Sequence, residues 1–107
     1  MAWMGIPKGS LSWQGVLHEY SISDIAVRGC CQDCGSTMTM NYHCYPDKTH
    51  VAVGSIVEGS EAVPRTASHI FIKNKPVWYD IPDGVEKWDE FDPEFEKRLR
   101  QHKHEEP

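Results

Sequence analysis

Short apolar runs separated by turn-forming residues recur along this 107-residue chain, and they restrict its fold more than any other feature. The runs are rich in β-branched and aromatic residues, and Gly, Pro, Asn, Asp or Ser bounds each of them, which is typical of strands. They occupy residues 11–20, 24–31, 37–45, 50–57 and 68–74. The sequence therefore predicts a mainly β protein.

Residues 37–42, TMTMNY, have the clearest strand pattern, because Met or Tyr alternates with Thr or Asn. Alternation of this kind places one kind of side chain on each face of a half-buried strand. Pro46 and Asp47 then supply a turn before residues 50–55, HVAVGS. We expect the two runs to pair as an antiparallel hairpin.

The C-terminal part of the chain departs from the strand pattern. Residues 73–84, KNKPVWYDIPDG, contain two prolines, so they are expected to form an aromatic loop or an edge. Asp92, Pro93 and the acidic residues after them are typical of a helix start. A short helix and tail are predicted over residues 92–104, with Glu94 paired to Arg98 and Glu96 paired to Arg100. The mixed-charge residues 96–107 are interpreted as a solvated helix face and a frayed tail.

Charge and composition exclude several classes of protein. The net charge is −5 and the isoelectric point is near 5.6, without a Lys/Arg cluster, which argues against a nucleic-acid partner. No apolar run is long enough to cross a bilayer, and the first ten residues lack the features of a signal peptide. We therefore expect one soluble, cytoplasmic domain over residues 1–107, with thiols rather than disulfides.

Cys31 and Cys34 form a C-x-x-C pair, which is typical of two thiolates that converge on one metal ion. Gly35 follows directly and suits the left-handed backbone that such a turn needs. Soft thiolate ligands favour zinc. A redox dithiol and two buried thiols remain alternatives, although the redox alternative is weakened because no helix pattern opens at the pair.

The other cysteines and the histidines are weaker candidates. Cys30 is interpreted as a small packed core residue, because neighbours on a strand point to opposite faces and only one of them can bind the ion. Cys44, His43 and His50 could complete a metal site, but exposed loop residues near a hairpin tip are favoured. His69 is interpreted either as a polar residue lining a cleft or as a histidine satisfied within the sheet.

Three segments together resemble a known family: residues 20–40, residues 50–56 (HVAVGSI) and residues 68–84. Their most specific elements are the pattern R-x-x-C-x-x-C-G-S, the V-G-S step and the H-I-F segment before proline and tryptophan. From about Gly9 to Trp88 the chain resembles the C-terminal portion of the glutathione-dependent formaldehyde-activating enzyme (GFA) domain, which is shared with centromere protein V, and particularly its fungal members.

This resemblance implies a partial β-tent of the Mss4-like kind and zinc as the cofactor. Family members resemble zinc-dependent carbon–sulfur lyases of the S-hydroxymethylglutathione synthase type, with glutathione and formaldehyde as small-molecule partners. Cys31 and Cys34 match one half of the family's structural zinc site, whereas Cys30 lies where phenylalanine is usual. His69, Trp78 and Tyr79 are possible substrate-cleft residues.

The family's N-terminal C-x-C pair and its catalytic C-x-C-x-x-C cluster have no counterpart here, so the zinc site is incomplete. We expect either an N-terminally truncated product or a reduced paralogue, inactive as a lyase when alone. The alternative is a zinc-knuckle structural or protein-binding module, with a homodimer that shares the ion. Without upstream strands, residues 1–10 are expected to be loosely held.

Overall fold

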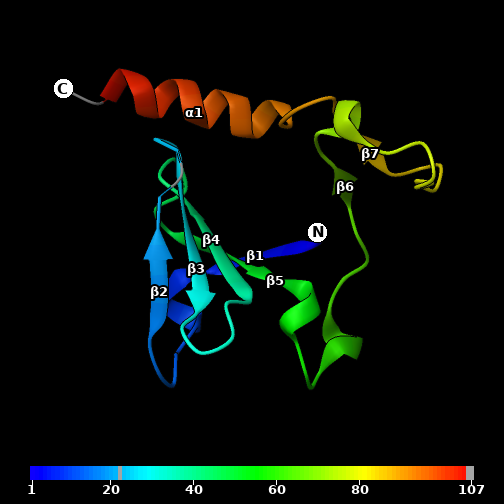
Figure 1. Cartoon of the computed structure of the whole chain (residues 1–107). Coiled ribbons are helices and arrows are strands. Elements are labelled where there is room, and N and C mark those ends of the chain that lie inside the picture. Colours follow the sequence, from blue (N-terminus) through cyan, green and yellow to red (C-terminus); the bar gives the residue numbers. More distant parts are fainter. Residues whose placement is uncertain (22, 106–107) are drawn as a thin grey trace. The chain divides into compact units, whose positions relative to one another are not determined.

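The computed structural model describes residues 1–21 and 23–105, which fall into two compact units, Met1–Glu58 and Gly59–Pro107. Within the described residues, a five-stranded antiparallel sheet and one C-terminal α-helix are the main elements (Figure 1). The prediction of a mainly β chain with a short C-terminal helix is confirmed. The β-tent assignment and the single domain over residues 1–107 stay predictions.

The sheet of the first unit has the strand order β1-β5-β4-β3-β2, and every neighbouring pair is antiparallel. Its strands are β1 (Trp3–Pro7), β2 (Leu17–Tyr20), β3 (Ala26–Cys31), β4 (Thr37–Tyr42) and β5 (Lys48–Ala52). The expected hairpin is confirmed, since β4 and β5 pair with Thr39 opposite Val51. Strand β5 ends at Ala52, earlier than predicted, because residues Val53–Ser55 form a 3₁₀ turn.

The expectation of a loosely held N-terminus is wrong. Residues Trp3–Pro7 form edge strand β1, which pairs with β5 from Trp3 opposite Ala52 to Pro7 opposite Lys48. Backbone bonds extend this pairing at both ends, from the Val53 N–H to the Ala2 carbonyl (3.0 Å) and from the Lys8 N–H to the Asp47 carbonyl (2.9 Å). The free edge of β5 supplies the hydrogen-bond partners that the segment needs.

The centre of the sheet is packed most tightly where β3 meets β4. Thr39 is 2% exposed and lies opposite Gly29, where a Cβ atom on the glycine would collide with the Thr39 Oγ1. The register then shifts after Gly29, so that Cys30 pairs with Thr37. Both faces of β4 are therefore partly covered, and polar Thr39 is more enclosed than Met38 or Tyr42 on the apolar face.

The second unit contains little regular strand. Its two strands, β6 (Ser68–His69) and β7 (Glu86–Lys87), pair in parallel. The predicted strand over residues 68–74 is largely wrong, because Phe71 adopts a left-handed backbone (φ 55°) and the chain turns into a 3₁₀ segment at Ile72–Asn74. Between the end of that segment and β7 the described chain forms no strand, as expected for an aromatic loop.

Helix α1 (Pro93–Glu105) begins and ends one residue later than the predicted range. The Asp92 carboxylate accepts a hydrogen bond from the Phe95 N–H (2.8 Å), and Glu94 pairs with Arg98 (3.4 Å), as predicted. The second predicted pair is wrong, because Glu96 and Arg100 form no ion pair within the described residues. Phe95 is buried and its ring stacks on Phe91, with ring centres 4.0 Å apart. Glu106 and Pro107 of the predicted tail lie outside the described residues. In the described chain no helix has the length and apolar character needed to span a membrane.

Candidate metal centre

The connection between β3 and β4, residues 31–36, is a tight turn that we call the knuckle. The Gly35 N–H donates to the Cys31 carbonyl (2.9 Å), and the Cys31 N–H donates to the Ser36 carbonyl (2.8 Å). Gly35 has φ 78°, in the left-handed region that glycine adopts without strain. The turn predicted at the C-x-x-C pair is therefore confirmed, and strands rather than a helix flank it.

The two knuckle thiols lie close enough to interact. Cys34 is exposed and Cys31 is half-buried, and both are free cysteines. The Cys34 Sγ lies 3.1 Å from the Ser36 Oγ. Hydrogen bonds with the Ser36 side chain and backbone, and a weaker one with the Cys31 side chain, lower the pKa of the Cys34 thiol. These contacts favour the thiolate, which is the form that binds metal.

The ligands present fit half of a tetrahedral zinc site. Two thiolates on one tight turn are the usual start of a structural zinc site. Among the residues that the structure describes, no group of three or more His, Cys, Asp or Glu side chains is gathered where it could hold an ion. A zinc ion held by the knuckle would therefore need further ligands from a second molecule, from solvent or from another segment.

The remaining cysteines are not part of the knuckle, although Cys30 directly precedes it. Cys30 is buried, as predicted, and its thiol donates to the Tyr20 hydroxyl at 3.7 Å, a contact that raises the pKa of Tyr20. Cys44 was expected in an exposed loop, but it is only 7% exposed, so that prediction is wrong. It lies in the β4–β5 connection, at the opposite end of β4 from the knuckle. Free cysteine is among the residue types that are most often buried, and this tendency could have predicted the burial of Cys44 from the sequence.

The two histidines near Cys44 differ from one another. His43 is exposed, as expected. His50 is not a loop residue; it lies in β5 opposite Met40 and Gly5, half-buried against the Tyr42 ring, with ring centres 5.4 Å apart. Burial, with a smaller contribution from the Lys48 charge, lowers the pKa of His50.

This burial predicts a pH-dependent stability. A histidine whose pKa is lower in the folded state binds more protons when unfolded, so the chain loses stability as pH falls below the unfolded value of about 6.5. The loss should be at most about 1 kcal/mol, because solvent reaches part of the ring. Urea unfolding at several pH values, compared between wild type and His50→Gln, measures it. An equal acid loss in both proteins would contradict the assignment.

The possible cleft residues all lie in the second unit. His69 is half-buried in β6, and its carbonyl accepts a hydrogen bond from the Trp88 N–H at 2.9 Å. Trp78 is 79% exposed, and its ring centre lies 6.3 Å from that of Tyr79. The Lys75 ammonium donates to the Tyr79 carbonyl at 2.5 Å and holds this part of the loop. The substrate-cleft assignment of these three residues stays a prediction.

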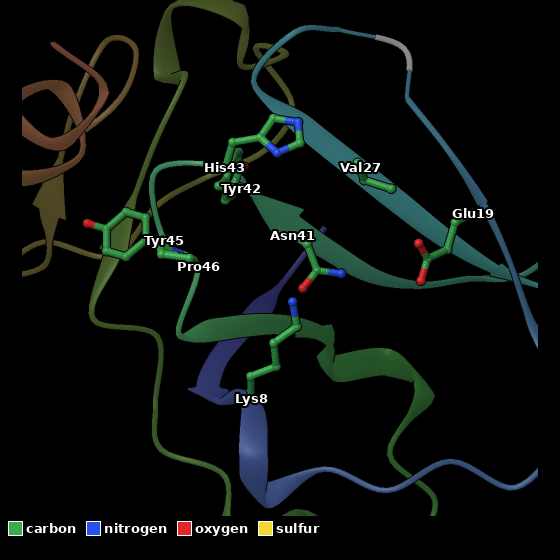
Figure 2. Close-up of a pocket in the computed structure, with 8 residues that line it drawn as sticks. All are labelled: Lys8, Glu19, Val27, Asn41, Tyr42, His43, Tyr45 and Pro46. Atoms are coloured by element: carbon green, nitrogen blue, oxygen red, sulfur yellow. The ribbon is translucent and has the colours of Figure 1, made fainter. Parts of the chain in front are cut away.

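A pocket in the first unit was missed by the sequence reasoning. It has a volume of about 300 Å³, and Figure 2 shows the side chains that line it: Lys8, Glu19, Val27, Asn41, Tyr42, His43, Tyr45 and Pro46. These residues come from four separate segments, and no sequence motif connects them. Strand pairing alone brings them together.

Comparisons with family models, with curated proteins and with solved structures gave no significant match to this chain. The GFA resemblance therefore stays a hypothesis.

Proposed function

We propose that this chain is a zinc-binding module in which Cys31 and Cys34 supply half of a structural four-thiolate site. The observation that supports the proposal is the knuckle, where backbone hydrogen bonds and the left-handed Gly35 hold both cysteines on one tight turn. A second copy of the chain, contributing the same pair, completes the ligand set with two-fold symmetry.

Zinc bound in this way is structural. Thiolate coordination links the ends of β3 and β4 in each chain, and the binding free energy adds to the stability of the folded dimer. The fold contributes to the zinc site by keeping both sulfur atoms on one turn. Cys34, the more exposed of the pair, is positioned to reach an ion held between two molecules.

The resemblance to the GFA family extends this proposal. We propose that the chain is a member of that family, related to carbon–sulfur lyases that act on glutathione and formaldehyde. By itself it should have negligible lyase activity, because a catalytic zinc site needs three protein ligands around an open position. The described residues bring no such set together.

Metal titration tests the proposal directly. Purified, reduced chain is titrated with Co²⁺ and then Zn²⁺, while sulfur-to-cobalt absorption and the molecular mass in solution are recorded. We expect a tetrahedral thiolate spectrum, about one ion per two chains and a dimer that forms with metal. Tight one-to-one binding by a monomer, or a chain that keeps its fold and takes up no metal, would overturn it. Lyase activity comparable to a full-length enzyme would overturn only the extension.

A further inference from the structure

The pocket shown in Figure 2 lies at the far end of the β3–β4 hairpin from the knuckle. Val27 of β3 and Asn41 of β4 are direct partners in the sheet, and Glu19 of β2 lies opposite Gly29, two residues along from Val27. Because side chains alternate along strands, Glu19, Val27 and Asn41 share one face of three adjacent strands. The pocket is therefore built on the sheet itself.

The pocket is lined by polar groups of different charge: a cation, an anion and an uncharged amide. Lys8 and Glu19 are both exposed and carry opposite charges, and within the described chain they form no ion pair with each other. The Asn41 Oδ1 is buried and has no hydrogen-bond partner among the described residues. A buried acceptor normally receives a hydrogen bond. This oxygen is enclosed and points toward the Lys8 side chain in Figure 2, so the polar groups open to a ligand are the Lys8 and Glu19 charges.

The position of each charge is set by the backbone. Lys8 follows β1, and its N–H donates to the Asp47 carbonyl at 2.9 Å, which ties it to the turn before β5. Glu19 is fixed by the pairing of β2 with β3. In Figure 2 Asn41 lies between Lys8 and Glu19, while Tyr45 and Pro46 occupy another side of the pocket. The cation thus comes from the turn after β1, and the carboxylate comes from β2.

We infer that this pocket binds a small zwitterion, an α-amino acid with an apolar side chain. Its ammonium group is placed at the Glu19 carboxylate, its carboxylate at the Lys8 ammonium, and its side chain against Tyr45 and Pro46. A simple anion would face the Glu19 charge, and a simple cation would face the Lys8 charge, so a ligand with both charges matches best. The volume suits a molecule of this size.

The inference is tested with three ligands that share one phenyl group: L-phenylalanine, 3-phenylpropionate, which lacks the ammonium, and 2-phenylethylamine, which lacks the carboxylate. Binding to the full chain is followed by NMR shifts of the Asn41 side-chain amide. We expect L-phenylalanine to bind with a dissociation constant on the order of 1 mM, and each single-charge ligand to bind about fivefold more weakly. Equal affinity for all three, or no saturable shift with L-phenylalanine, overturns the inference.

Two variants assign the charges. Lys8→Gln should weaken the binding of L-phenylalanine about fivefold and leave the binding of 2-phenylethylamine unchanged. Glu19→Gln should also weaken the binding of L-phenylalanine about fivefold, but it should leave the binding of 3-phenylpropionate unchanged. Lys87→Gln, in the second unit, is the control and should change none of the three. Unchanged affinity for L-phenylalanine in both pocket variants would contradict the assignment. Metal-free chain should bind L-phenylalanine as well as metal-loaded chain, so the outcome is independent of the zinc proposal.

Discussion

Replacing Cys31 by serine is expected to abolish zinc binding and the metal-dependent dimer together. A serine hydroxyl is not deprotonated at neutral pH and is a poor zinc ligand, so each knuckle would lose one of its two thiolates. Cys34→Ser should have the same effect, although Cys34 is the exposed member of the pair. The measurement is the zinc content per chain and the molecular mass of each variant, both determined at the same protein concentration.

Cys30→Ala and Cys44→Ala are the matched controls, because both residues are buried cysteines outside the knuckle. Each should retain zinc and lose about 1 kcal/mol of unfolding free energy, which in Cys30→Ala includes the hydrogen bond to Tyr20. If zinc binding survives in Cys31→Ser but disappears in Cys44→Ala, the ligands have been assigned to the wrong end of the β3–β4 hairpin.

Gly29→Ala should destabilise the sheet by about 2–3 kcal/mol, which is the upper part of the range for overpacking a well-packed core. The new methyl group would collide with the Oγ1 of Thr39, the most enclosed side chain of the core, and would also press on the Leu17 side chain at 3.3 Å. Thr39 is β-branched and buried, so it has little freedom to move aside. Urea unfolding monitored by circular dichroism measures the loss.

A double-mutant cycle separates this collision from a general effect of losing glycine. Thr39→Ala removes the Oγ1, which is buried without a hydrogen-bond partner among the described residues, so Gly29→Ala should cost about 1 kcal/mol or less in that background. Gly54→Ala, where an added Cβ meets nothing within 4 Å, is the control and should stay within about 0.5 kcal/mol. Additive losses at positions 29 and 39 would show that the collision is not the cause.

Local chemistry made several elements predictable from the sequence. The alternation in residues 37–42, the turn at Pro46 and the Asp92–Pro93 helix start each depend on neighbouring residues, and each is present in the structure. The knuckle turn was predictable for the same reason, because it depends on a single residue, Gly35, that adopts the left-handed backbone which the turn requires.

The failures depend on partners that are distant in sequence. The N-terminal strand forms because the edge of β5 is free to pair with it, and the pattern of residues 1–10 does not indicate this partner. The strand expected over residues 68–74 stops because the backbone of Phe71 turns left-handed, a conformation that its residue type does not favour. Lys8, Glu19 and Asn41 meet only after four strand pairings have formed, so the pocket has no local signature.

The strand order also has a consequence for folding kinetics. Strands β2 to β5 follow one another along the chain, so each of their pairings closes a short loop. Strand β1 must instead pair Pro7 with Lys48, which closes a much longer loop at a larger entropic cost. The β2–β5 meander is therefore expected to form first and β1 to dock afterwards, with mutations in β1 accelerating unfolding more than they slow folding. Until β1 docks, the backbone amides of β5 remain open to any other extended chain, which makes this interval the one in which aggregation competes with folding.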